Sequence, residues 1–525
     1  MSVTPVAFLK PRQAAEDERA KSILVFRPEM AVFVNCLHAA GSLYECPISA
    51  EFAEQQHLEY QRKLESFGID VYNVSDVLIK GCEDPKVLNE LRNFAGTCLS
   101  YNLPENQSHI FASEDYKHKT LIKLSAGELV KVILTNPTIH LMLDNRNTGI
   151  ITKKVEMEPM GNCVFTRDQQ ITTKNGVVMC NFAASQRAKE AKILEFTLKK
   201  LNINPIGRIH DVPEATMEGG DFVILTQDTC ALGIGLRSSY SAGQYMMQND
   251  LLGFKRFLMV KDVFDQHQDR MHLDCTFSPI HQKLAVIDQE ILKKDKLRYV
   301  DEFIRLDKYD PVRKSWYRLN RANVEFGAFL EGEGYSLIKL PHEYQLAYGC
   351  NMLNLGCING HYKVLTVHND SRDYIMNSPE YKKYCEVNKV NIDVEYVEFR
   401  AITSMYGSLH CASQVLERFS FEEDKIVREA DKIQQVEPEF DYVIEVPTFC
   451  NREDLVQEAQ NKYNELIASG KTVYLVNKYW IGHFVSLKNA NVKSVEEVLQ
   501  LLRNEDLAAQ DMSKLDLNDC MLKLK

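Results

Sequence analysis

Long apolar runs are absent from this chain of 525 residues. No window approaches the ~20 consecutive apolar residues that a membrane-spanning helix requires, so we expect no membrane partner. Residues 1–21 are polar and lack the apolar core of a signal peptide, which favours a cytoplasmic protein. With 45% hydrophobic and 26% charged residues, the composition is that of a globular protein large enough for more than one packed unit.

Basic clusters and paired cysteines are also absent. The net charge of -11 argues against a nucleic-acid partner, because binding to nucleic acid depends on clustered Lys and Arg that neutralise phosphates. The 14 cysteines are irregularly spaced, and no two form a C-x-x-C pair. We therefore expect free thiols in a reducing compartment, without disulfides and without a zinc site.

What the chain does contain is a repeated unit in which an amphipathic helix is followed by a strand. Its helices place apolar residues three or four apart, and its strands are β-branched or alternating, as expected for helices packed outside a sheet. Clear copies lie at 58–74, 194–209, 244–260 and 381–399, and a weaker copy lies at 328–340. Further strands are expected at 23–26, 177–181, 223–225, 230–234, 284–287 and 364–367. The pattern predicts an α/β fold whose five units close around an axis, with an open α/β sheet as the alternative.

Two regions interrupt the repeats. Residues 76–153 have helical patterns and little strand character, so we expect an inserted helical module. A charged connector at 421–439 runs up to Pro438, and beyond it the pattern of two strands (442–446, 472–476) around a helix (452–467) indicates a small α/β appendage. We divide the chain into an N-terminal segment (1–21), a catalytic domain (22–420), the connector and a C-terminal accessory domain (440–525).

Four short polar clusters lie beside apolar, strand-like residues, where a rigid scaffold can aim their side chains. They are Phe165–Asp168, Glu218–Asp221, His272–Asp274 and His410–Cys411. Together they supply carboxylates, an imidazole and a thiol, which is the set needed to hold a planar cation and attack its central carbon. A guanidinium is such a cation.

Each cluster also has a structural explanation. Carboxylates that open an apolar strand are costly to bury without a cation, but a tight turn with exposed acids would also explain Glu218 and Asp221. In an extended segment, His272 and Asp274 would face one pocket, yet they could equally be a core histidine and a surface acid. Phe165 could stack on a flat cation or simply fill the core. Cys411 is one cysteine of many and could be a buried thiol without a chemical role, so its assignment as a nucleophile depends on the other clusters.

The clusters belong to five motifs that resemble those of the arginine deiminase family, within the wider guanidino-group modifying (amidinotransferase) superfamily. The matching segments are EPMGNCVFTRD (158–168), MEGGD (217–221), GIGLRSS (233–239), MHLD (271–274) and GSLHC (407–411). The resemblance covers residues 22–414. It implies a five-bladed pseudo-symmetric α/β propeller, and the helical insertion is what separates arginine deiminases from their shorter relatives.

The resemblance also implies a reaction and a role for each residue. The enzyme would hydrolyse the guanidinium of L-arginine to citrulline and ammonia through a Cys-linked amidino intermediate, with no metal and no organic cofactor. Cys411 would be the nucleophile and His272 the general acid/base. The guanidinium would bind Asp168 and Asp274, with Glu218 supporting the imidazole. The remaining substrate contacts would come from Asn162, Phe165, Asp221, Arg237 and Arg187. The partner is then a small guanidino substrate, and we expect a homo-oligomer.

Two departures from the family pattern keep alternatives open. Family members carry an arginine between two glycines just before the nucleophile, whereas residues 403–408 here read TSMYGS. Unless Arg400 reaches in, only Arg237 is left for a free carboxylate, so agmatine, a modified arginine or a peptidyl arginine is an alternative substrate. A catalytically silent arginine-binding protein is a second alternative. The extension beyond residue 419 resembles that of only some family members.

Overall fold

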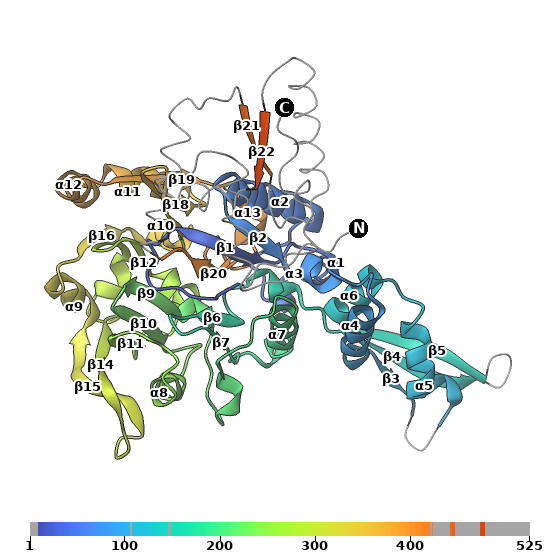
Figure 1. The fold of residues 1–525 in the computed structure, drawn as a ribbon. Helices are drawn as coiled ribbons and strands as arrows, with labels where there is room; N and C mark the ends of the chain where they lie inside the picture. The colour runs from blue at the N-terminus through green and yellow to red at the C-terminus, as the bar shows by residue number, and fades with distance from the viewer. Residues whose placement is uncertain are drawn as a thin grey trace, which may run out of the picture.

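The computed structural model describes residues 9–104, 108–144, 149–420 and 423, together with the backbone of two strands at 442–446 and 473–477. Within these residues the strands form several small sheets with helices packed around them (Figure 1). The α/β class predicted from the sequence is confirmed.

Five of the sheets contain the same pattern of three strands. In each, the second strand lies in the middle, pairs antiparallel with the first, and pairs parallel with a third that follows a helix. The units are β6 Gln170–Thr172, β7 Val177–Met179, β8 Gly207–Arg208; β9 Phe222–Thr226, β10 Thr229–Ile234, β11 Arg256–Asp262; β12 Phe277–His281, β13 Leu284–Asp288, β16 Ser336–Leu340; β17 Leu353–Ile358, β18 His361–Thr366, β19 Asn391–Tyr396; and β20 Gln414–Arg418, β1 Ala20–Val25, β2 Asp70–Asn73. In the last unit β20 pairs with β1, which joins distant parts of the chain in one sheet.

The repeats of a helix followed by a strand are confirmed. Each third strand is preceded by a helix: α2 Ala50–Ser66, α7 Glu190–Lys200, α8 Tyr240–Gln248, α9 Phe326–Gly332 and α12 Pro379–Asn388. Serine caps begin several of them, and the Ser49 side chain accepts a hydrogen bond from the Phe52 backbone N–H at the start of α2. Other helices of this part are α1 Met30–Cys36, α10 His342–Leu346, α11 Asn369–Asn377 and α13 Arg400–Thr403.

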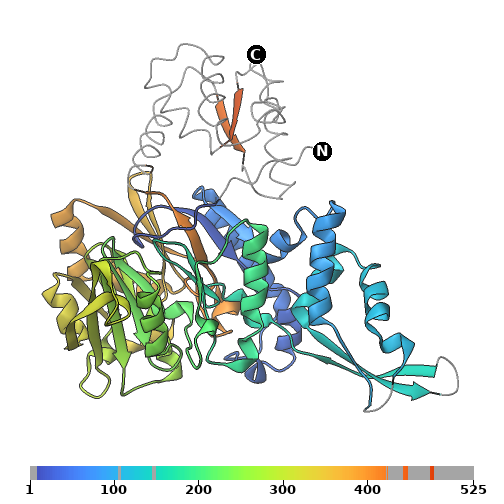
Figure 2. The ribbon, with the colours of Figure 1, turned by 60° about the horizontal axis from the view of Figure 1, so that its bottom comes forward.

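The inserted segment contains a sheet as well as helices, so the prediction that it has little strand character is wrong. Its helices are α3 Val74–Ile79, α4 Pro85–Cys98, α5 Glu114–Leu121 and α6 Ala126–Thr135, and its sheet is β3 Ser100–Asn102, β4 Pro137–Asp144 and β5 Gly149–Met157. The β4–β5 hairpin extends away from the rest of the described chain (Figure 2). Most of β5 is exposed on both faces, so its sequence lacks the alternation on which strand prediction depends.

A second long hairpin, β14 Arg298–Asp310 and β15 Ser315–Glu325, was not expected from the sequence. It pairs with β11 and widens that sheet to five strands. Much of β15 is exposed and polar, which again hides the strand signal.

The N-terminal segment is not a separate polar tail, because residues 13–19 are buried against the domain. Backbone hydrogen bonds join Arg12 to both Leu416 and Arg418 on β20. The Arg418 side chain is almost fully buried and donates to Glu16 Oε2 over 3.0 Å. Charge pairing of this kind is what permits acidic residues to enter a core.

In the C-terminal part, the two strands expected there are confirmed. β21 Tyr442–Val446 and β22 Val473–Asn477 pair in parallel. The predicted connector and the helix at 452–467 lie outside the described residues, and the domain boundaries stay predictions. Among the described residues, no helix is long and apolar enough to cross a membrane.

Candidate active site

Each of the five units places one polar side chain just before its first strand. Asp168 precedes β6, Asp221 precedes β9, Asp274 precedes β12, Asn351 precedes β17 and Cys411 precedes β20. All five are at least nine-tenths buried. The same position in each repeat thus supplies a carboxylate, an amide or a thiol.

The thiol of Cys411 is held by an amide and a carboxylate. Its Sγ accepts a hydrogen bond from Asn351 Nδ2 over 3.2 Å and lies 3.8 Å from Asp274 Oδ2. The backbone N–H of Cys411 donates to Asn351 Oδ1 over 3.3 Å. Burial and the carboxylates of Asp274 and Asp168 raise the pKa of Cys411 well above its usual range, which favours the thiol over the thiolate.

A buried imidazole and carboxylate pair lies beside this thiol. His272 Nε2 and Glu218 Oε2 are 2.9 Å apart. Burial alone would raise the pKa of Glu218, but the hydrogen bond and charge of His272 hold it at about 2. Burial likewise opposes a charge on His272, yet Cys275, Glu218 and the nearby carboxylates raise its pKa well above the usual range. His272 is therefore poised as a proton donor.

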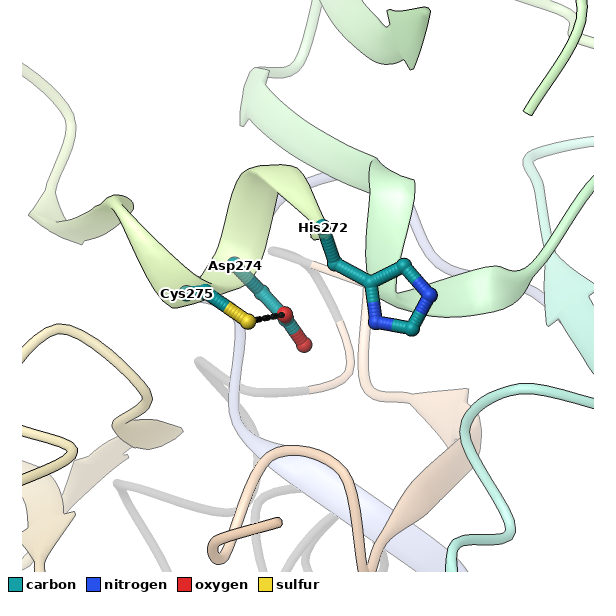
Figure 3. Close-up of side chains that lie close together, drawn as sticks. All are labelled: His272, Asp274 and Cys275. Atoms are coloured by element: carbon teal, nitrogen blue, oxygen red, sulfur yellow. Dashed lines mark hydrogen bonds between the residues drawn. The ribbon is translucent and has the colours of Figure 1, made fainter. Parts of the chain in front are cut away.

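The His272–Asp274 segment is not extended, so that prediction is wrong. Leu273–Cys275 forms one turn of 3-10 helix with His272 at its N-terminal end. Figure 3 shows that the turn still brings the imidazole and the carboxylate to one side. Gly220 is pressed against both, since a Cβ built there would lie 2.6 Å from His272 Nδ1 and 3.2 Å from Asp274 Oδ1. The Glu-Gly-Gly-Asp motif thus needs a glycine at this position.

Asp168 forms a buried ion pair with Arg187. Arg187 Nη1 donates to Asp168 Oδ2 over 2.9 Å, and its Nη2 donates to Glu190 Oε2 over the same distance. The second oxygen of Asp168, Oδ1, is buried without a hydrogen-bond partner in the described part of the chain. Arg187 Nη2 also donates to the backbone oxygen of Asn162 over 3.2 Å, so Arg187, Asn162 and Asp168 come together as one group.

The other predicted site residues surround this group. Asp221 accepts hydrogen bonds from Ser238 Oγ over 2.6 Å and from the Leu273 backbone over 3.0 Å, so it braces the turn that carries His272. Arg237 Nη1 lies 3.8 Å from Glu218 Oε1. Phe165 supports the loop before the nucleophile, because a Cβ at Gly407 would lie 2.2 Å from its ring.

Sequence reasoning missed three residues. Asn351 could have been found, because its place before an apolar strand matches that of Asp168, Asp221 and Asp274. His410 was recognised only as the neighbour of Cys411 and given no role, but it lies in a turn, and its Nδ1 is 2.8 Å from Asp274 Oδ2. Glu190 is the first residue of α7, and nothing in the sequence around it indicated a role in the site.

The chain is similar to known proteins along most of its length. A profile described as arginine deiminase matches residues 41–418. An arginine deiminase of Halobacterium salinarum is 23% identical over 489 residues, covering 78% of this chain and 97% of the relative. That of Staphylococcus aureus strain JH9 is 25% identical over 291 residues, covering 52% of this chain and 66% of the relative.

Solved structures were matched at lower similarity. A dimethylarginine dimethylaminohydrolase mutant from Pseudomonas aeruginosa, in complex with citrulline, gives a TM-score of 0.40 at 14% identity, over 76% of this chain and all of the other. The N-terminal domain of a cyanobacterial arginine dihydrolase gives a TM-score of 0.42 at 11% identity, over 76% of this chain and 97% of the other.

The family profile spans more than half of the chain and includes the turns that carry Asp168, Asp274 and Cys411. The chain therefore belongs to the arginine deiminase family, hydrolases that cleave C–N bonds of amidines in the guanidino groups of arginine-like substrates.

Proposed function

We propose that this protein hydrolyses L-arginine to citrulline and ammonia through an amidino intermediate on Cys411. The proposal is supported chiefly by the position of the Cys411 thiol, which lies between Asn351 and Asp274. The His272–Glu218 pair completes the set with a proton donor.

Binding of the substrate provides the charge that activates the thiol. A guanidinium keeps its proton at physiological pH and is planar, so carboxylates can accept hydrogen bonds along its edges. Asp274 and the unpartnered Oδ1 of Asp168 fill this role. The cation then offsets the two carboxylates that raise the pKa of Cys411, which favours the thiolate at the moment when its target is in place.

The reaction proceeds in two halves. The Cys411 thiolate attacks the guanidinium carbon, His272 donates a proton to one terminal nitrogen, and ammonia leaves when the C–N bond breaks. An amidino thioether remains on the sulfur. His272, now neutral, takes a proton from water, and the hydroxide attacks the same carbon. The C–S bond then breaks to release the thiolate, and the former hydroxyl group gives its proton to solvent, which leaves the neutral ureido product.

Arg237 is the candidate cation for the substrate carboxylate. Arg400 is exposed at the start of α13, and residues 403–408 contain no arginine. These two observations favour a second candidate function, hydrolysis of a guanidine without a free carboxylate, such as agmatine or a peptidyl arginine. The same residues would carry out the chemistry.

The purified chain incubated with arginine, agmatine and an arginyl peptide tests the proposal, with ammonia and ureido product measured for each. We expect turnover of arginine, and loss of both turnover and the covalent adduct in Cys411→Ser. Full activity of Cys411→Ser would exclude the mechanism. Binding of arginine without product from the unaltered chain would identify a silent arginine-binding protein.

We further propose that the five three-stranded units are the blades of a closed five-bladed propeller. The position shared by Asp168, Asp221, Asp274, Asn351 and Cys411 supports this arrangement, because equivalent strand ends would converge on one axis. A crystal structure in which the five sheets lie in one open layer would contradict it.

A further inference from the structure

A second thiol lies beside the candidate acid/base. Cys275 is on the same turn as His272 and Asp274, and its Sγ donates to Asp274 Oδ1 over 3.6 Å. His272 Nδ1 is buried and has no hydrogen-bond partner within the described residues. Figure 3 shows that this nitrogen faces the carboxylate and the thiol. One ligand atom from each of the three side chains lies within 4.8 Å of the other two.

The distances suit a tetrahedral cation. Zinc bonds of about 2.3 Å to sulfur and about 2.1 Å to oxygen, at the tetrahedral angle, place the two ligand atoms about 3.6 Å apart. The observed separation of Cys275 Sγ and Asp274 Oδ1 is 3.6 Å. The ligand nitrogen of His272 lies within 4.8 Å of both atoms and would have to approach them to reach the same centre.

The imidazole is also prepared for a metal by its other nitrogen. An ionised carboxylate can only accept, so Nε2 of His272 donates to Glu218, and Nδ1 is the nitrogen that can bind a metal once it has released its own proton. A carboxylate that orients a histidine in this way is the usual second partner of a zinc-bound imidazole.

We propose that His272 Nδ1, Asp274 Oδ1 and Cys275 Sγ bind one Zn²⁺ ion, with the fourth position open toward Cys411. An imidazole, a thiolate and a carboxylate favour zinc over the hard cations magnesium and calcium. The Cys275 thiol and the Nδ1–H of His272 each release a proton to solvent when the S–Zn and N–Zn bonds form. The sequence prediction of no zinc site relied on the missing C-x-x-C pair, and this site uses a different spacing.

Zinc at this position would inhibit the enzyme. This consequence rests on the proposed function, because it removes His272 and Asp274 from the reaction. Metal binding itself does not depend on catalysis, so it can be measured in the Cys411→Ser variant, where turnover is absent.

Titration of the full chain with Zn²⁺ against a chromogenic zinc chelator tests the site, and Co²⁺ provides a spectrum that reports a thiolate ligand. We expect one equivalent of tight binding and a sulfur-to-cobalt charge-transfer band. Cys275→Ser should lose the charge-transfer band, and its affinity for Zn²⁺ should fall by about tenfold to a hundredfold. Cys46→Ser is the matched control, because Cys46 is an exposed thiol.

Inhibition is measured relative to the metal-free rate of each variant. Cys275→Ser should require more Zn²⁺ for half inhibition, and Cys46→Ser should not. Cys275→Ala, which removes the ligand without adding a polar group, should behave like the serine variant. Equal zinc affinity and an unchanged cobalt band in both Cys275 variants would overturn the site, and so would the absence of one-equivalent binding in the unaltered chain.

Discussion

At the scale of single residues, the buried carboxylates of the site are paired with basic side chains of the protein. Asp168 would be an unpaired buried carboxylate without Arg187, and Glu218 is paired with both His272 and Arg237. Asp274 is paired with His410, and these contacts lower its pKa against the effect of burial. Under the proposed function, a guanidinium would meet acceptors that are already held in place and would need no large rearrangement of them.

The first residue-scale prediction concerns substrate choice. Arg237→Ala should lower the affinity for arginine about tenfold to a hundredfold, because a charge-assisted pair contributes ~1.5–3 kcal/mol. Agmatine has no carboxylate and should lose far less. The measurement is KM and kcat for both compounds. Equal losses would assign Arg237 a structural role through its contact with Glu218.

The second concerns Asp221 and pH. Burial raises the pKa of Asp221 from 3.8 to about 7, although Ser238 and the Leu273 backbone oppose the shift. The folded state thus keeps a proton that the unfolded state releases, so Asp221 reduces stability as the pH rises from about 4 to 7. Asp221→Asn keeps the shape and stays neutral. It should unfold at a higher temperature at pH 8 and be more stable by about 4 kcal/mol, because the shift is about three pKa units and each unit corresponds to ~1.4 kcal/mol.

At pH 4 both proteins are neutral at this position, and their melting temperatures should coincide. A stability difference that does not change between pH 4 and pH 8 would show that the carboxyl group is not responsible.

At the scale of elements, the turns before the first strands hold the candidate site residues, and the N-terminal segment packs against one of those strands. β20 directly follows Cys411, and its Arg418 donates to the backbone oxygens of Glu18 and Asn354 as well as to the side chains of Gln13 and Glu16. The segment 9–19 therefore acts as a strap across the sheet that supports the nucleophile.

Arg418→Met should consequently destabilise the fold by about 3–5 kcal/mol, because it leaves Glu16 buried without its partner. The matched control is Arg313→Met, where an exposed side chain pairs with Asp310, and no measurable change is expected. Urea unfolding followed by circular dichroism compares the two. If both variants unfold at the same urea concentration as the unaltered chain, the strap does not stabilise the sheet.

At the scale of the whole molecule, the candidate site lies entirely within residues 162–411 of the described chain. Strand β20 ends at Arg418, and the backbone N–H of the next residue, Phe419, still donates to the backbone oxygen of Arg19. None of the site's hydrogen bonds described above involves a residue beyond this point.

Truncation after residue 435 should therefore leave a folded protein with measurable hydrolase activity. Light scattering of both forms would reveal whether the removed part contributes to a homo-oligomer. An insoluble or inactive product would mean that the C-terminal part belongs to the catalytic domain, and our domain division would then be wrong.

The sequence alone determined the features that are encoded by neighbouring residues. The helix and strand repeats follow from local periodicity, and the polar clusters before the strands, including those of Asp168, His272 and Cys411, were recognisable as contiguous motifs. Their grouping into one site followed from the chemistry that they supply together and from the resemblance of the motifs to those of the arginine deiminase family.

Only the tertiary structure decided which distant side chains meet. The pairing of Asp274 with His410, of Asp168 with Arg187, and of the Cys411 thiol with Asn351 joins segments whose separation in the chain conveys no distance in space. The burial of the acidic strap and the exposed β4–β5 sheet were likewise hidden, because neither follows the rule that polar residues face water and strands alternate. In both cases long-range packing outweighs the local pattern.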